Sequence, residues 1–185
     1  MNARFAREDG TTIIEVVIAS AILVTLMAGL MSLAGLAIST TENQGHLAAR
    51  TTEYAQDKME QLLALAYGDS TSDSTVFPAL NSGGTGLAVG GSSNPTSPVA
   101  KYVDYLDQSG NLCGSASALA ATPSCAAPVG TTAPTNWFYE RAWSVSTPSG
   151  TTNLKQITVT ATIARGFGGG TKASSVLTVL KTSPF

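Results

Sequence analysis

The sequence contains few of the residues from which common active sites are built. Its 185 residues include one histidine and two cysteines, which leaves little material for a zinc site or a histidine-dependent triad. Charged residues make up 12% of the chain, about half of the quarter that is usual in soluble proteins. Ten basic against twelve acidic residues argue against the cationic face of a general nucleic-acid binder. We therefore expect no enzyme of the commoner kinds, no metal site and no cofactor.

Apolar residues are concentrated in one N-terminal segment. Residues 11–38 contain one ionisable side chain, Glu15, and as a helix they would be roughly 42 Å long, enough to cross a hydrocarbon core of about 30 Å. A cleaved secretory signal has an apolar region of only ~7–15 residues, so this segment is too long for one. Arg4 and Arg7 precede it and the next basic residue is Arg50, so the positive-inside rule places the N-terminus in the cytoplasm and the rest of the chain outside it.

Glu15 is the exception within this apolar segment. A carboxylate near the start of a membrane helix costs on the order of 2–3 kcal/mol even on lenient insertion scales, which makes the residue a candidate for function. The alternative is that Glu15 lies close enough to the interface to be solvated by lipid headgroups, and the residue alone does not decide between the two. Its surroundings are Arg7-Glu8-Asp9-Gly10-Thr11-Thr12-Ile13-Ile14-Glu15-Val16-Val17-Ile18-Ala19.

This string resembles the class III signal of type IV pilins and type II secretion pseudopilins. In that family a short charged leader ends in glycine, and an apolar segment follows with glutamate at the fifth position of the mature chain. Gly10 matches the residue before the cleavage site, and Glu15 matches the fifth-position carboxylate. Thr11 departs from the family, which most often has phenylalanine there, and this weakens the resemblance to a major pilin more than to a minor one.

The resemblance implies a maturation step and an assembly step. Prepilin peptidase would cleave between Gly10 and Thr11, and the new amine of Thr11 would be N-methylated. An α-amino group with a reference pKa near 8 is largely cationic at neutral pH, and in the family it pairs with the fifth-position carboxylate of a neighbouring subunit. The resemblance therefore assigns the assembly contact to Glu15. It names the prepilin peptidase/N-methyltransferase, other pilin or pseudopilin subunits and the inner membrane as partners.

Beyond the membrane segment the helix is expected to continue, as an amphipathic half, to about Tyr67, with Gly68 as its C-cap. One side of the helical wheel collects apolar and small residues, and charges occupy the rest. The residues on that side are Leu47, Thr51, Tyr54, Ala55, Leu62, Leu65 and Ala66. The stretch 54–62 also resembles the helix of minor pilins of the PilV and pseudopilin-I type.

Residues 68–98 are rich in Gly, Ser, Thr, Asn and Pro, which indicates a long surface connection; it corresponds to the variable loop of pilins. Asp69 and Asp73 in this loop fall short of the six to eight oxygen ligands of calcium. Four later stretches have the composition and alternation of strands. They are Val99–Leu106, Trp137–Val145, Ile157–Ile163 and Val176–Lys181.

The expected fold class is α+β. A long N-terminal helix would pack on a C-terminal antiparallel meander of about four strands, an arrangement that the resemblance identifies as the pilin fold. The expected segments are a leader (1–10), a membrane and assembly helix (11–38), its amphipathic continuation (39–67), the variable loop (68–98) and the sheet (99–185).

Cys113 and Cys125 lie in a loop rich in Gly, Ala, Ser and Pro. The inferred orientation places them in an oxidising compartment, where such a pair is usually bridged. A disulfide that closes about a dozen residues would contribute roughly 2–3 kcal/mol of stability. Free thiols and pairing with another chain are the alternatives.

Three other signals are weaker. Residues 166–172 lack the Gly-Lys-Ser/Thr order of a phosphate-binding loop, and they indicate a hairpin turn instead. His46 has no partner set by a motif and is expected to be an exposed helix residue. Tyr139, Arg141 and Trp143 could stack on DNA, as in competence pilins. Because alternation puts all three on one face, we expect them to pack beneath the helix, with Arg141 snorkelling or paired.

Taken together, the residues and the resemblance predict a structural minor subunit of a type IV pilus or a type II secretion pseudopilus, and not an enzyme. Before assembly it would cross the bacterial inner membrane once, with its C-terminal domain in the periplasm. The alternatives are a membrane-anchored extracytoplasmic binding domain and a DNA-uptake pilin. A periplasmic enzyme would need a base–nucleophile pair that the sequence does not reveal. The sequence does not separate pilus, secretion and competence systems, and neighbouring genes would discriminate them.

Overall fold

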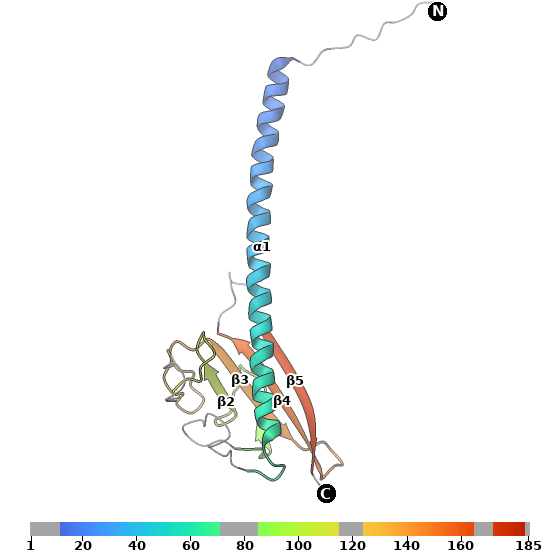
Figure 1. Cartoon of the computed structure of the whole chain (residues 1–185), viewed down its shortest axis with the longest axis vertical. Helices are drawn as coiled ribbons and strands as arrows, with labels where there is room; N and C mark the ends of the chain where they lie inside the picture. The colour runs from blue at the N-terminus through green and yellow to red at the C-terminus, as the bar shows by residue number, and fades with distance from the viewer. Residues whose placement is uncertain (1–11, 71–84, 115–123, 165–171, 184–185) are drawn as a thin grey trace, which may run out of the picture. The chain divides into compact units, whose positions relative to one another are not determined.

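The computed structural model describes residues 12–70, 85–114, 124–164 and 172–183. The fold class is α+β, as predicted: one long N-terminal helix and an antiparallel sheet of five strands (Figure 1). The elements are α1 (Ile13–Ala64), β1 (Gly90–Gly91), β2 (Val103–Leu106), β3 (Tyr139–Ser146), β4 (Leu154–Ile163) and β5 (Ser174–Thr182). The chain divides into two compact units, Met1–Glu42 and Asn43–Phe185, and α1 contributes residues to both.

Strand β3 is the central strand and pairs with three others, β1, β2 and β4. The strand order is β1-β3-β4-β5, β2 pairs with another part of β3, and every pair is antiparallel. β2 pairs with the first half of β3, where Val103 faces Ala142, and β1 pairs with its second half, where Gly90 faces Val145. The turn between β3 and β4 is closed by a hydrogen bond from the Thr151 amide to the Pro148 carbonyl at 3.2 Å. Strands β2 to β5 therefore form the meander that the sequence predicts.

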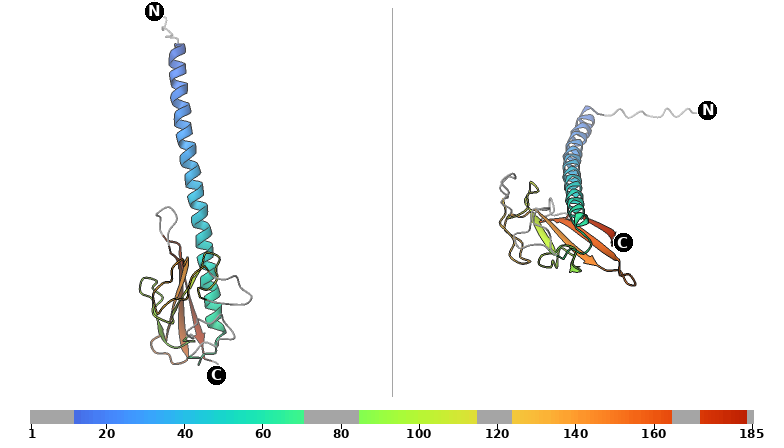
Figure 2. Two further views of the ribbon diagram at one scale, coloured as in Figure 1. Left: turned by 90° about the vertical axis from the view of Figure 1, so that its left-hand side faces the viewer. Right: turned by 60° about the horizontal axis from the view of Figure 1, so that its bottom comes forward.

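In the C-terminal unit the second half of α1 lies across one face of the sheet (Figures 1 and 2). Tyr54 of α1 contacts Tyr139 of β3 edge-on, with ring centroids 4.7 Å apart. Burial of a large apolar side chain contributes about 1.5–3 kcal/mol, so this layer is the main source of the unit's stability. The core between helix and sheet includes Ala55, Met59, Leu62, Leu65, Trp143, Val145, Ile157, Val159, Ala161 and Ile163.

The opposite face of the sheet carries a second, smaller core, formed by Val103, Tyr105, Cys113, Cys125 and Ala142. The sequence predicts that the threonines of β4 face water. Thr160 and Thr162 are buried instead, at 5% and 8% exposure. Their cross-strand neighbours are Ala142 and Glu140, on the same face as the second core. That face is therefore buried next to β2 and exposed toward β5 and the end of β3.

The end of the helix and the start of β2 differ from the sequence prediction. The helix ends at Ala64, before Tyr67, and Gly68 does not have the left-handed backbone of a glycine cap. The Asp69 carboxylate accepts a hydrogen bond from the Ala66 amide at 2.8 Å and helps to turn the chain there. Strand β2 is shorter than predicted because the Tyr102 amide donates to the Val99 carbonyl in a turn.

Strand β1 lies inside the segment that the sequence assigns to a surface loop. It consists of two glycines, and Gly91 has a φ of +81°. A Cβ atom at Gly91 would lie 2.4 Å from the Trp143 carbonyl oxygen and 2.4 Å from Cδ1 of Tyr102. Only glycine permits this approach, because it has no side chain and adopts positive φ without strain. The sequence rule that treats paired glycines as turns therefore misses this strand.

Candidate functional site

The first turn of α1 is capped by the side chain before it. The Glu15 amide donates to the carbonyl of Thr12 at 3.0 Å and, more weakly, to its Oγ1 at 3.4 Å. Threonine followed three residues later by glutamate has the spacing of a capping box, and a carboxylate in the first turn interacts favourably with the helix dipole. Glu15 therefore has a local role in a single copy of the chain, which the sequence interpretation did not foresee.

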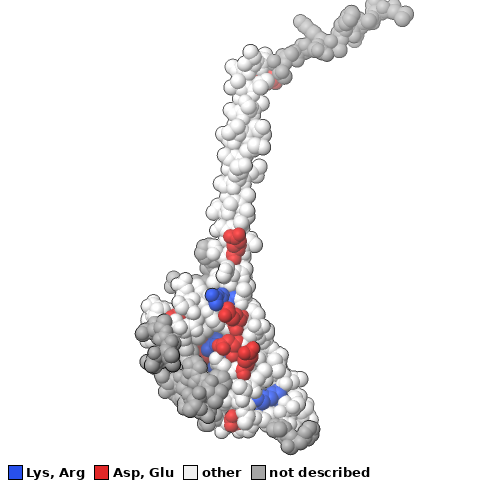
Figure 3. All heavy atoms as spheres, in the orientation of Figure 1, with Lys and Arg blue, Asp and Glu red and all other residues white. Residues whose placement is uncertain are grey.

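The part of α1 in the N-terminal unit presents an apolar surface. Its large apolar side chains, from Ile13 to Ile38, are 54–85% exposed. Hydroxyl groups do not interrupt this surface, because those of Ser20, Thr25 and Ser32 donate to carbonyls three or four residues earlier in the helix. In Figure 3 this part of the helix is almost free of charge, whereas acidic side chains gather along its later turns.

An exposed apolar helix of this length needs an apolar environment. Among the described residues, α1 is the one helix long and apolar enough to cross a membrane. Its backbone bonds are satisfied within the helix, as a membrane span requires. The N-terminal helix is thus consistent with a transmembrane segment. The predicted cleavage and methylation residues, Gly10 and Thr11, lie outside the described residues, as do Asp73 and residues 166–171.

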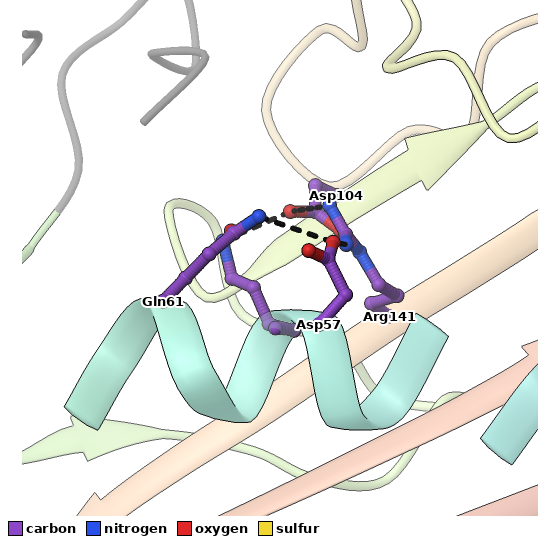
Figure 4. A network of polar contacts seen from close by, with 5 residues as sticks. Asp57, Gln61, Asp104 and Arg141 are labelled. Carbon is purple, nitrogen blue, oxygen red and sulfur yellow. Dashed lines mark hydrogen bonds and ion pairs between the residues drawn. The ribbon is translucent and has the colours of Figure 1, made fainter. Parts of the chain in front are cut away.

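Four charged side chains meet between α1 and the sheet in the C-terminal unit. Arg141 donates from Nε to Oδ1 of Asp104 at 2.7 Å and from Nη2 to Oδ2 at 3.0 Å. Its Nη1 donates to Oδ2 of Asp57 at 2.6 Å, and Nζ of Lys58 lies 3.0 Å from Oδ2 of Asp104. Figure 4 shows Asp57 of α1 next to Arg141 of β3 and Asp104 of β2, with Gln61 of α1 donating to Asp57. We call Asp57, Lys58, Asp104 and Arg141 the charge quartet.

Three members of the charge quartet are buried, the side chain of Asp57 is 54% exposed, and the four charges cancel. Asp104 and Arg141 are 1% and 2% exposed, and Lys58 is 9% exposed. Burial would raise the pKa of Asp104, but the positive charges of Arg141 and Lys58 outweigh it and lower that pKa. Burial lowers the pKa of Lys58, and the negative charge of Asp104 opposes that shift. Nζ of Lys58 also lies 4.0 Å from the ring centroid of Trp143, a cation–π contact.

The quartet bears on the alternative that Tyr139, Arg141 and Trp143 stack on DNA. Tyr139, Arg141 and Trp143 are all buried beneath α1, and Arg141 is paired, so this face is not available for stacking on DNA. The sequence interpretation missed Lys58 as a buried residue. The available signal was its position, one turn after Tyr54 on the apolar side of the wheel.

Two lysines from the sheet hold the C-terminal end of α1. Lys181 of β5 donates to the carbonyls of Leu63 and Leu65, and Lys155, its cross-strand neighbour on β4, donates to the carbonyl of Tyr67 at 2.6 Å. The last carbonyls of a helix lack intrahelical partners, and cations are favourable there. These lysines satisfy carbonyl groups at the helix end, where the sequence predicts a glycine cap.

Cys113 and Cys125 are joined by a disulfide whose Cα atoms are 4.9 Å apart, in the second core. The structure thus contains the intrachain disulfide, and not free thiols or a pairing with another chain. The Asp107 carboxylate secures the same loop, because it accepts hydrogen bonds from the amides of Asn111 at 2.9 Å and Ser124 at 3.2 Å. Burial would raise the pKa of Asp107, but these hydrogen bonds lower it.

Glu140 is a buried carboxyl group on the face of the second core. The residue is 5% exposed, and its Oε1 has no hydrogen-bond partner in the described part of the chain. Its cross-strand neighbours are Tyr105 on β2 and Thr162 on β4. Burial raises the pKa of Glu140 to about 7, and the positive charge of Lys172 opposes this shift only in part. The group is therefore largely neutral in the folded chain at mildly acidic pH.

This raised pKa predicts a pH-dependent stability. A carboxyl group whose folded pKa lies above its unfolded value stabilises the fold fully below the unfolded value, near 4.5, and that contribution is lost as the pH rises through about 7. Glu140→Gln removes the titration. The melting temperature of the wild-type chain should therefore fall relative to that of Glu140→Gln between pH 5 and pH 8. The exposed Glu60→Gln serves as the control, and parallel curves for Glu140→Gln and wild type would contradict the prediction.

Within residues 12–70, 85–114, 124–164 and 172–183, no group of three or more His, Cys, Asp or Glu side chains could hold a metal ion. No protein-family model matches the chain, and neither the curated proteins nor the solved structures contain a significant match to it. The class that the structure defines is thus an α+β domain that carries a long N-terminal helix able to span a membrane.

Proposed function

We propose that the chain is a structural minor subunit of a type IV pilus or a type II secretion pseudopilus, matured by prepilin peptidase and N-methylation. The observation that carries this proposal is an exposed apolar helix segment with a single carboxylate, Glu15, in its first turn. The later turns of the same helix pack on a small sheet. Before assembly the helix would lie in the bacterial inner membrane with the sheet in the periplasm. The function is packing, and no catalytic residue or cofactor is assigned.

The exposed helix suits two successive environments. It can bury its apolar side chains in lipid and later against the helices of neighbouring subunits, since both are equally apolar. The demands on Glu15 differ between the membrane and the filament, because a charge inside a low-dielectric bundle of helices needs a partner of opposite charge. The new amine of Thr11 from an adjacent subunit supplies one. Such a pair also fixes the axial position of one helix against the next, as buried polar groups do in coiled coils.

One observation favours a second candidate, a plain membrane-anchored binding domain. The Thr12 hydroxyl caps the first turn at the Glu15 amide, and the helix dipole favours a carboxylate in that turn, so Glu15 has a use that requires neither cleavage nor a neighbouring subunit. In this case the leader would remain attached and the helix would serve only as an anchor.

The two candidates differ in the mature N-terminus, which mass spectrometry of the chain from its native host measures. We expect the first residue to be Thr11, with one added methyl group on its amine. A Gly10→Val variant is the matched control, because it should remain uncleaved while still inserting in the membrane. Retention of Met1, or cleavage near Ala37, would contradict the pilin proposal and favour the anchor.

A further inference from the structure

The apolar contact between α1 and the sheet does not by itself specify one position along the helix. Between its polar groups, which are the Asp104–Arg141 pair, Ser175 and the two lysines near the helix end, the sheet face beneath α1 is apolar. The helix side that meets it repeats apolar or small residues every three or four positions, at Thr51, Tyr54, Ala55, Met59 and Leu62. Hydrophobic burial is non-directional. A slip of one turn, roughly 5.4 Å along the axis, would still place apolar side chains on an apolar face.

The charge quartet is directional where the apolar contact is not. Asp104 and Arg141 are cross-strand neighbours, so the sheet holds them together as a bidentate pair whatever the position of the helix. After this pairing, Oδ2 of Asp104 can still accept and Nη1 of Arg141 can still donate. Adjacent helix residues fill both places, Lys58 on Asp104 and Asp57 on Arg141.

No neighbouring position along the helix could replace these two residues. A shift by four residues in one direction would bring Glu53 and Tyr54 to the places of Asp57 and Lys58, and a shift in the other direction would bring Gln61 and Leu62. Neither pair contains a cation. In both cases the buried Asp104 loses its second cation, and an incompletely paired buried charge is costly.

We propose that the charge quartet is an axial-register lock: among the positions of α1 that the apolar core accepts, it selects the one in which Asp57 and Lys58 meet Arg141 and Asp104. This inference concerns the C-terminal unit alone. It does not depend on the proposed pilin function.

Engineered disulfides can report the register. The hydroxyl oxygens of Thr52 and Ser175 are 2.8 Å apart, so the double variant Thr52→Cys/Ser175→Cys should cross-link when the helix is in its observed register. Ala48→Cys/Ser175→Cys and Gln56→Cys/Ser175→Cys report a slip of one turn in either direction. Each pair is introduced into the full chain, purified in detergent under oxidising conditions, and quantified by mass spectrometry of its peptides.

The decisive background replaces the quartet with apolar residues: Asp57→Ala, Lys58→Met, Asp104→Leu and Arg141→Met. We expect this chain to fold, because replacing a buried ion pair or triad as a whole by apolar residues is often neutral or stabilising, and Asp57, the fourth member, is exposed. The Thr52–Ser175 cross-link should decrease and the one-turn-shifted cross-links should rise about tenfold, because the cost of an incompletely paired buried charge no longer excludes those registers. Arg50→Met is the matched control: it removes an exposed ion pair with Glu53, which lies within the same helix and involves no sheet residue, and it should leave the cross-links unchanged.

A folded quartet-free chain that retains the wild-type cross-linking pattern would overturn the proposal. If that chain does not fold, the single variant Lys58→Met decides, since it keeps the Arg141–Asp104 pair and removes only the helix cation. It should shift the cross-links in the same direction, and Lys58→Arg should restore the wild-type pattern. Unchanged cross-links in folded Lys58→Met would also count against the lock.

Discussion

Replacing Arg141 with methionine should lower the free energy of unfolding by about 3–5 kcal/mol, the usual cost of removing one partner of a buried ion pair. Methionine keeps much of the apolar stem but removes three charged hydrogen bonds, two to Asp104 and one to Asp57. Asp104 is 1% exposed and cannot turn to water, so Lys58 alone must compensate its charge. Denaturant titration of the full chain in detergent, followed by the fluorescence of Trp137 and the buried Trp143, measures the change.

An exposed arginine provides the control for this prediction. Arg50 forms an ion pair with Glu53 one turn along α1 at 3.0 Å, and both side chains are about half exposed. Surface ion pairs of this kind contribute little to stability, so Arg50→Met should leave the unfolding midpoint almost unchanged. If the two arginine variants lost similar stability, burial of the quartet would not be the source of the effect.

The single and the complete replacement of the quartet should have opposite outcomes. Arg141→Met leaves a buried carboxylate short of a cation, whereas removal of all four charges leaves an apolar contact with nothing to compensate. Breaking such a network lowers the free energy of unfolding strongly, whereas removing it entirely changes that free energy little. The network therefore contributes more to the choice of one helix position than to net stability. This distinction separates the stability test of Arg141 from the cross-linking test of the register.

The fold was accessible from the sequence because its signals are local and periodic. The unbroken apolar run through Ile38 predicts the helix, and alternation in Tyr139–Val145 and Ile157–Ile163 predicts two strands of the sheet and the face of each that meets α1. These patterns depend only on the period of the backbone, 3.6 residues in a helix and two in a strand. The paired glycines of β1 carry no side-chain pattern, so the same reasoning could not find that strand.

The polar contacts were less accessible because their partners are distant in sequence. Asp57 and Arg141 are 84 residues apart, and Lys181 lies 116 residues beyond the Leu65 carbonyl that it binds. A lysine in an amphipathic pattern predicts a solvated residue unless the opposing carboxylate or carbonyl is known. The sequence therefore gave the correct face for Arg141 and left its pairing open, and it did not identify Lys58, Asp104, Lys155 or Lys181.

Replacing Glu15 with alanine should leave membrane insertion intact and reduce incorporation into a filament at least about tenfold, if the proposed function is correct. Insertion depends on the apolar run, and alanine removes the one ionisable side chain that opposes it. Incorporation depends on a partner for the Thr11 amine of the adjacent subunit, which alanine cannot provide. The measurement is the amount of the variant in purified filaments relative to the amount in the membrane fraction.

The local cap and the assembly contact make different demands on the same first turn, and matched variants separate them. Thr12→Ala removes the capping hydroxyl and should cost about 1 kcal/mol of helix stability, but it keeps the charge of Glu15 and should incorporate almost normally. Glu15→Gln keeps a polar side chain of the same size but loses the charge, and it should fail as Glu15→Ala does. If Glu15→Gln incorporates normally while Thr12→Ala does not, incorporation requires the helix cap and not the charge, and the assembly role assigned to Glu15 is wrong.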